Sequence, residues 1–448
     1  MQPIARPRAL GPVVSLAILL ASLLAACAGP GRSASSQSPA SEATAGTHPT
    51  AAPPAAVADA SSDAFLVVGR QGQAGLEVIV ASSLERVYEL PAGVPGEHWG
   101  TLVAATQADG ATVVEDITVQ PELPARDRSV PGNWRLPSIG DDALPVGVSA
   151  DGSTVVLVED GKAGEAATTR FAVLARGSAA RILELPGSLE FDALSPDGSI
   201  LYVVEHLPGP PDAHYQVRAV DLPSGLVRDA VIVDKRNLDE SMGGWPITQA
   251  RHGNGVAFTL YRGAEHPFVH ALNTVEAWAV CLDLPEIGSD DPKAAGDWGL
   301  ATHGDRGAVY TVNATLGLAA AIDPGELSIR RTASFEAPRA AATISLAKFG
   351  HQDAGPVGRR AVVSPDGSSL YAAGAGGIVR LETERLTVTR TLLTGAAVDA
   401  LALTPDGSTL YALLGADGRI VKLDAASGEV LGQVPGAGFD RLVAVVPG

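Results

Sequence analysis

The chain has 448 residues, of which 46% are hydrophobic and only 4% aromatic, and its formal net charge is -18. This length allows one large domain or two of ordinary size. An acidic chain repels the phosphate backbone, so the charge argues against nucleic acid as a partner and is ordinary for a soluble surface. The 50 Gly and 32 Pro residues predict a chain with many turns.

Residues 1–26 have the pattern of a secretory signal peptide. Arg6 and Arg8 form the basic region, and the apolar core from Val13 to Leu24 is shorter than a membrane-spanning helix requires. The segment ends in Leu-Ala-Ala-Cys, which resembles the lipobox of bacterial lipoproteins. That resemblance implies cleavage before Cys27, lipid attachment to its thiol, and anchoring to the cell membrane or the outer membrane. The alternative is a plain secretory signal with an incidental cysteine.

Residues 27–63 consist almost entirely of Ala, Ser, Pro, Thr and Gly. Such a segment cannot bury enough apolar surface to order itself, so we expect a disordered linker between the lipid and a domain that begins at residue 64. If Cys27 carries lipid, the second cysteine, Cys281, has no partner for an intrachain disulfide. Cys281 lies in an apolar run, and we expect it to be a small core residue.

From residue 64 to residue 448, short apolar runs alternate with turn residues, which is typical of an all-β domain. The tetrapeptide Pro-Asp-Gly-Ser begins at Pro196, Pro365 and Pro405, and variants of it occur elsewhere. In this turn Pro fixes the first φ angle, Asp accepts hydrogen bonds from the backbone, and Gly supplies a positive φ. Seven copies place the central turn residue at Asp109, Asp151, Asp197, Asn254, Asp305, Asp366 and Asp406.

A second turn, Asp-x-x-Ser-Gly, recurs at Asp221–Gly225 and Asp424–Gly428. Each unit is therefore expected to contain four short antiparallel strands, and such repeats resemble the blades of a β-propeller. The unit Ser-Pro-Asp-Gly-x-x-Leu-Tyr resembles the YVTN-type and WD40-like repeats of exported bacterial proteins. This resemblance covers residues 64–448 and implies a fold but no single function. Seven motifs plus one split blade predict eight blades; seven remains the alternative if Asn254 marks an insertion.

The end of the chain has the pattern of a first strand. Phe439–Gly448 resembles Phe191–Gly198, whereas Phe65–Gly93 contains what would be second, third and fourth strands. We therefore expect the C-terminal strand to complete the N-terminal blade and close the ring, which removes two exposed sheet edges. Long spacings predict loops near 234–245, 285–298 and 336–357, where function would be located.

The sequence lacks the motifs of several propeller-containing enzymes. No Gly-x-Ser-x-Gly elbow occurs, and no Trp follows the repeated Asp-Gly pairs as it does in sialidases. Asp424–Gln433 has the turn of a quinoprotein docking motif without its Trp, so we predict no cofactor. The repeated aspartates are distributed one per blade and are expected to be structural rather than converging catalytic carboxylates.

Candidate ligand groups for a metal are few, and we predict no metal site. His266 and His270 would share one side of a strand but lie apart along it. The other candidates are more simply explained as solvated loops: Glu205, His206 and His214; Gly140–Leu144; and Gly288–Pro292.

Five tryptophans are potential platforms for stacking sugars, with packing inside the blades as the alternative. Trp245 and Trp298 are the better candidates because they lie at the ends of expected insertions, and the others are Trp99, Trp134 and Trp278.

Together these patterns predict a lipid-anchored, extracytoplasmic propeller that acts as a noncatalytic binding or scaffold module for a protein, a polymer or a small ligand. The alternative is a lactonase-like hydrolase that acts on a small ester or lactone with a metal or carboxylates over the central channel. A structural role in the cell envelope is a third possibility. The sequence identifies neither a catalytic residue nor a ligand.

Overall fold

The structure is a computed structural model in which the chain divides into two units, residues 1–59 and 60–448. It describes residues 64–446 except for 74, 84, 97–98, 119–126, 141–144, 161–167, 208–213, 237–241, 264–265, 287–293, 295, 305–306, 341–356, 416–417 and 435–437. The predicted signal peptide, linker and lipid attachment site at Cys27 lie outside the described residues. No helix in the described part of the chain is both long enough and apolar enough to cross a membrane.

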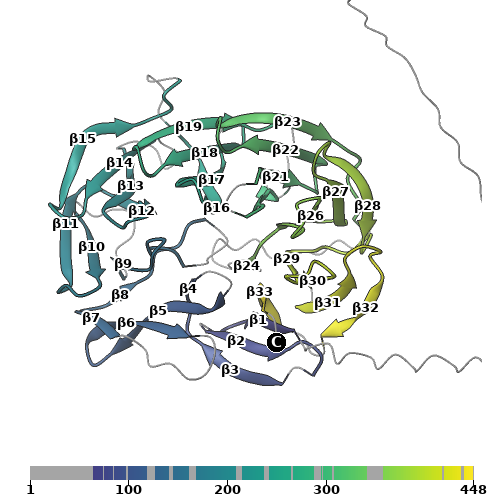
Figure 1. The fold of residues 1–448 in the computed structure, drawn as a ribbon, viewed down its shortest axis with the longest axis horizontal. Helices are drawn as coiled ribbons and strands as arrows, with labels where there is room; N and C mark the ends of the chain where they lie inside the picture. Colours follow the sequence, from purple (N-terminus) through teal and green to yellow (C-terminus); the bar gives the residue numbers. More distant parts are fainter. Residues whose placement is uncertain are drawn as a thin grey trace, which may run out of the picture. The chain divides into compact units, whose positions relative to one another are not determined.

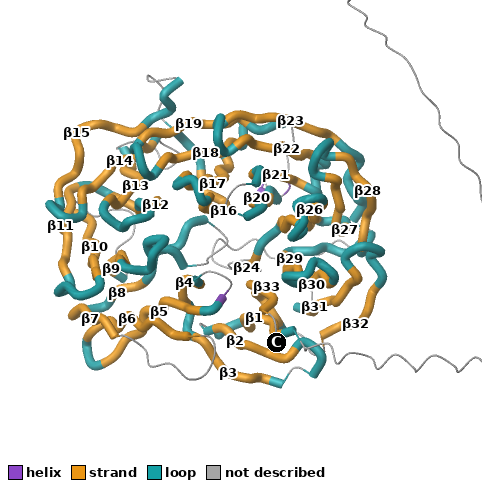
Figure 2. Tube along the Cα trace, in the orientation of Figure 1, coloured by secondary structure: helices purple, strands orange, loops and turns teal. Residues whose placement is uncertain are grey.

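The described residues of the second unit form eight β-sheets arranged in a ring, the blades of a β-propeller (Figure 1). Figure 2 shows that the unit is almost entirely strand and loop. The predicted all-β class and the count of eight blades are therefore confirmed, and the alternative of seven blades is wrong. We number the blades along the chain, counting the blade that contains the N-terminal strands as the first.

The strands of the first four blades, from the inside of the ring outward, have the following bounds. The first blade contains β33 (Phe439–Val446), β1 (Phe65–Arg70), β2 (Leu76–Val80) and β3 (Arg86–Leu90), with β24 (Val357–Gly358) added parallel to β33; the second contains β4 (Gly93–Pro95), β5 (Thr101–Ala108), β6 (Ala111–Thr118) and β7 (Asp127–Pro131); the third contains β8 (Trp134–Arg135), β9 (Thr154–Glu159), β10 (Thr168–Ala175) and β11 (Arg181–Pro186); and the fourth contains β12 (Leu189–Leu194), β13 (Ile200–His206), β14 (Tyr215–Asp221) and β15 (Leu226–Ile232).

The other four blades follow the same order. The fifth contains β16 (Trp245–His252), β17 (Val256–Arg262), β18 (Phe268–Asn273) and β19 (Trp278–Asp283); the sixth contains β20 (Gly299–Thr302), β21 (Val309–Asn313), β22 (Leu318–Asp323) and β23 (Ser328–Ser334); the seventh contains β25 (Ala361–Val363), β26 (Ser369–Gly374), β27 (Gly377–Glu382) and β28 (Thr387–Leu392); and the eighth contains β29 (Ala400–Leu403), β30 (Thr409–Leu414), β31 (Arg419–Asp424) and β32 (Val430–Val434).

The core lies between the blades rather than inside any one of them. Eight hydrophobic clusters each combine residues from two neighbouring blades, and together they run around the whole ring. Second strands such as β26 are buried along their full length, whereas the outermost β28 is exposed at all but its last residue. This gradient follows from geometry, since inner strands have a neighbouring blade on both faces.

The C-terminal strand closes the ring as the sequence predicted. In Figure 1 the yellow β33 lies beside the purple β1. The two strands pair antiparallel from Phe65↔Val446 to Arg70↔Phe439, with register shifts at two points. The first blade is therefore built from one C-terminal and three N-terminal strands. This pairing satisfies the inner edge of β1, which would otherwise be unpaired.

The first copy of the repeated turn differs in its place within the blade. The turns at Asp197, Asp366 and Asp406 join the first and second strands of their blades. Asp109 instead joins β5 to β6, the second and third strands of its blade, in a two-residue hairpin. Asp109 and Gly110 both have positive φ angles, 50° and 80°, as a type I′ hairpin turn requires. The regular spacing of the motif in the sequence therefore does not show that its first copy joins a different pair of strands.

Candidate functional site

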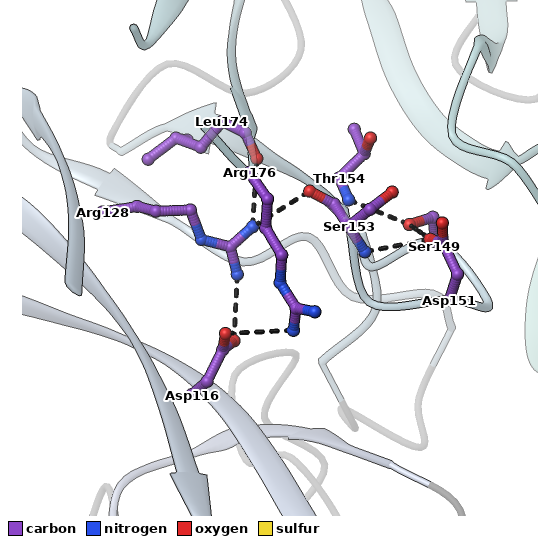
Figure 3. Close-up of polar contacts among 8 residues, drawn as sticks. All are labelled: Asp116, Arg128, Ser149, Asp151, Ser153, Thr154, Leu174 and Arg176. Carbon is purple, nitrogen blue, oxygen red and sulfur yellow. Dashed lines mark hydrogen bonds and ion pairs between the residues drawn. The ribbon is translucent and has the colours of Figure 1, made fainter. Parts of the chain in front are cut away.

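The turn aspartates hold their own turns together through hydrogen bonds. In Figure 3 the Asp151 carboxylate accepts from the Ser149 hydroxyl at 2.6 Å and from the Ser153 backbone N–H at 2.9 Å. The corresponding contacts recur at Asp197, Asp366 and Asp406. These donors lower the pKa of each carboxyl, that of Asp366 to about 2, because they favour the charged form. Asp305 lies outside the described residues.

The same part of Figure 3 contains an ion-pair network that links the second and third blades. Asp116 accepts from Arg128 at 2.9 Å and from Arg176 at 3.1 Å. Arg128 also donates to the backbone carbonyls of Ser153 and Leu174 in the third blade. All three charged side chains of this network have partners within the protein, so we assign it to blade packing rather than to ligand binding.

The histidine and carboxylate groups considered as metal ligands are engaged separately. His266 pairs with Asp283 at 3.0 Å, whereas His270 is fully buried. The Glu205 carboxylate accepts from Gln216 and Arg218, and His206 pairs with Glu190 at 3.3 Å. Among the described residues, no three His, Cys, Asp or Glu side chains gather around a point that could hold a metal. Gly288–Pro292 and all of Gly140–Leu144 except Gly140 lie outside the described residues.

The tryptophans divide into buried and exposed residues. Trp298 is 1% exposed and belongs to the core between the fifth and sixth blades, so it cannot stack against a ligand. Trp134 is also buried, with its indole N–H donating to the carbonyl of Pro131. Trp245 is 49% exposed and remains available on the surface. Trp278 carries the ammonium of Lys235 over its ring at 3.4 Å.

A polar cluster that the sequence did not reveal lies between the innermost strands of the fourth and fifth blades. We call Asp192, Gln249 and Arg251 the rim cluster. Asp192 is at a β-bulge in β12, where the register against β13 shifts between Phe191 and Ala193. The bulge breaks the alternation of side chains and allows a carboxylate to turn into an otherwise apolar interface. Asp192 is 2% exposed as a result.

The Asp192 carboxyl is only partly satisfied. Nε2 of Gln249 on β16 donates to the backbone carbonyl of Asp192 at 3.1 Å and lies 3.4 Å from its Oδ1. Oδ2 is buried without a hydrogen-bond partner among the described residues. Burial raises the pKa of Asp192 to about 7, although the charge of Arg251 and the Gln249 hydrogen bond act in the opposite direction. This carboxyl therefore exchanges its proton near neutral pH.

Arg251 extends from the fifth blade across the inner edge of the fourth. Its Nη1 donates to the carbonyl of Val148 in the third blade at 2.9 Å. A side chain that joins the third and fifth blades must pass inside the fourth, so it lies toward the centre of the ring. Arg251 is exposed to solvent, yet the surrounding protein lowers the pKa of its guanidinium by desolvation, offset by the charge of Asp192. Within the described residues Arg251 forms no ion pair.

A second charged pair flanks the rim cluster on the same strand. Glu190 precedes Asp192 by two residues on β12 and faces His206 on β13. The contact with His206 lowers the pKa of Glu190, and the same contact raises the pKa of His206. Both side chains are partly exposed to solvent. The innermost strands of the fourth and fifth blades thus carry a guanidinium and two acidic groups.

The sequence carried only a faint signal for this site. Asp192 interrupts an apolar strand in Phe-Asp-Ala-Leu, and Gln249 and Arg251 alternate on the following inner strand. No motif joins them, because Asp192 is 57 residues or more from the other two and none of the three belongs to a repeated turn. A charged residue at a predicted core position was the one feature that pointed to them.

Comparison with known proteins supports the fold alone. A scan against protein-family models finds no match, and no curated protein sequence matches either. The structure of apo AztD from Citrobacter koseri is similar over 86% of this chain and 98% of that chain, with 13% identity and a TM-score of 0.52. The dihydro-heme d1 dehydrogenase NirN, solved in complex with DHE, is similar over 85% of this chain and 75% of that chain, with 14% identity and a TM-score of 0.50.

Proposed function

We propose that this chain is a lipid-anchored extracytoplasmic protein whose propeller binds a small organic carboxylate at the rim cluster. One observation carries the binding proposal: Arg251 is an exposed residue at the inner edge of the ring, and among the described residues its guanidinium has a single hydrogen-bond partner, the carbonyl of Val148. A guanidinium recognises a carboxylate through paired, charge-assisted hydrogen bonds. Its position on β16, a strand rather than a loop, fixes its direction before the ligand arrives.

The other members of the cluster define what the rest of the ligand carries. The Asp192 carboxylate lies close enough to Arg251 that its charge partly offsets the desolvation that lowers the pKa of the guanidinium, and Asp192 Oδ2 has no hydrogen-bond partner among the described residues. An acceptor next to a cation suits a ligand in which a hydroxyl or amino group lies close to the carboxylate. Hydroxy acids and amino acids have this chemistry, so we place the ligand in these two classes.

We expect Arg251→Gln to weaken binding of such a ligand by about 10–100-fold, because a hydrogen bond to a charged group contributes roughly 1.5–3 kcal/mol. Calorimetric titration of the full chain with a panel of hydroxy and amino acids measures this effect. Arg86→Gln is the matched control, since Arg86 is an exposed outer-strand arginine that pairs with Glu89. Binding that is equally weak in both variants, or equally strong in both, would contradict the proposal.

Hydrolysis of a small ester or lactone is the second candidate function, and Asp192 favours it. A carboxyl with a pKa of about 7 can act as a general acid or base at neutral pH. Turnover of a lactone panel by the full chain, lost in Asp192→Asn, would establish hydrolysis in place of simple binding.

The anchor is tested separately from the ligand. We expect Cys27→Ser to move the protein from the membrane fraction to the soluble fraction, because the resemblance to lipoproteins assigns the lipid to the thiol of this residue. Fractionation of cells that express the two forms, with a radiolabelled fatty acid as tracer, measures the change. Equal labelling of both forms would rule out Cys27 as the attachment site.

A further inference from the structure

The fifth blade contains a buried histidine whose ring has no hydrogen-bond partner. His270 lies in the middle of β18 and is 0% exposed. Neither Nδ1 nor Nε2 forms a hydrogen bond within the described residues. Buried polar atoms are nearly always paired, because an unpaired one is destabilising. In either tautomer this ring leaves one donor and one acceptor unused by the described residues, so both nitrogens are available to a ligand.

The residue directly opposite His270 on the next strand is Cys281. β18 and β19 pair antiparallel with His270 and Cys281 in register, so both side chains project from the same face of the sheet. Side chains at directly opposed positions have Cβ atoms about 4.5–5.5 Å apart. The unpartnered imidazole is therefore directed at the space that the thiol also faces.

A second sulfur lies in the surroundings of this pair. Met242 and Cys281 both contact the hydrophobic cluster between the fourth and fifth blades. The ring of Tyr261 meets the His270 ring edge-on at 6.3 Å and closes that side. Cys281 is not fully buried, and it lies on β19, the outermost strand of its blade. The backbone N–H of Cys281 donates to Asp234 Oδ2 at 3.0 Å, and Asp234 forms a parallel bridge with Ala279 along the outer edge of β19.

We propose that His270 and Cys281 bind a soft monovalent metal ion, Cu(I), with the Met242 thioether of the same cluster as an additional donor. Thiolate and thioether sulfur with imidazole nitrogen is the donor set that selects Cu(I) over hard divalent ions. Desolvation lowers the pKa of His270 to about 4, so its imidazole is neutral and able to coordinate at physiological pH. The site lies on the outer strands and is separate from Arg251 on β16.

The test uses the full chain with Cys27→Ser, which leaves Cys281 as its single thiol. Cu(I) is titrated under reducing, anaerobic conditions against the chelator bathocuproine disulfonate. We expect one equivalent to be retained, and we expect Cys281→Ser and His270→Phe each to weaken binding by at least about 100-fold, since loss of an outer-shell partner alone costs 10–100-fold. X-ray absorption should then show sulfur and nitrogen scatterers at the ion.

Two controls keep the result interpretable. His266→Gln changes an exposed histidine at the start of the same hairpin, and it should leave Cu(I) affinity unchanged. Thermal unfolding of each variant without copper reports whether the fold is retained; Cys281→Ser, at a partly exposed position, tests the site if His270→Phe fails to fold. The proposal is wrong if the chelator removes all copper from the starting protein, or if Cys281→Ser retains its affinity. A normal response to carboxylates alongside either result would leave the rim-cluster proposal intact.

Discussion

Removal of residues 439–448 should abolish cooperative folding of the propeller. This deletion removes β33, which packs against the eighth blade through Phe439, Leu442 and Val445 and against the second blade through Val443 and Ala444. Each large side chain contributes about 1.5–3 kcal/mol on burial, so the loss is on the order of 10 kcal/mol. That equals the entire stability of an ordinary domain, roughly 5–15 kcal/mol. Circular dichroism during thermal or urea unfolding measures the outcome.

A pair of point variants separates the strand's packing from simple shortening of the chain. Leu442→Asp places a charge at a position that is 0% exposed, and it should lower the midpoint of unfolding severely. Asp440→Asn changes a partly exposed residue two positions earlier and should have little effect. If the truncated protein unfolds at the same temperature and with the same cooperativity as the intact chain, ring closure by β33 does not stabilise the propeller.

The architecture was predictable because it depends on local chemistry that repeats. Each Asp-Gly turn fixes a reversal of the chain within a few residues, and the apolar runs between turns are the length of one strand. Even the closure followed from a local resemblance, since the end of the chain has the pattern of β12. The place of the Asp109 turn within its blade was not predictable. The same dipeptide suits both a hairpin between the second and third strands and one between the first and second.

The site was not predictable because it depends on contacts between blades. Arg251 reaches Val148, which is 103 residues earlier in the chain, and no short motif records such a contact. The β-bulge that turns Asp192 into the interface is likewise a property of pairing between β12 and β13. His270 and Cys281 were both noted in the sequence, but their register across β18 and β19 becomes visible only once the strands pair. The repeated turns therefore determine the propeller scaffold, whereas the residues of the two proposed sites belong to no repeated turn.

Replacing Asp192 with Asn should make the protein more stable at pH 8 and should flatten its dependence on pH. Burial raises the pKa of this carboxyl to about 7 from 3.8, so between these values the folded state binds a proton that the unfolded state has lost. Stability from this group is therefore fully present below about pH 4 and is lost as the pH rises to about 7. At 1.36 kcal/mol per pKa unit the loss is on the order of 4 kcal/mol, and Asn, which cannot ionise, avoids it.

The measurement is the difference in the free energy of unfolding between Asp192→Asn and the unmodified chain from pH 4 to pH 8, by urea titration. Asp197→Asn on the same blade is a control for which we expect a change in the free energy of unfolding of the opposite sign. The pKa of Asp197 is lowered by the Ser195 and Ser199 hydrogen bonds, so its ionised form stabilises the fold above its unfolded pKa and that stability is lost at acid pH. Asp197→Asn should therefore be destabilising at pH 7. If Asp192→Asn is also less stable than the unmodified chain at pH 8, Arg251 compensates the buried charge fully. Asp192 would then be a permanently ionised partner of Arg251 rather than a group that exchanges a proton near neutral pH.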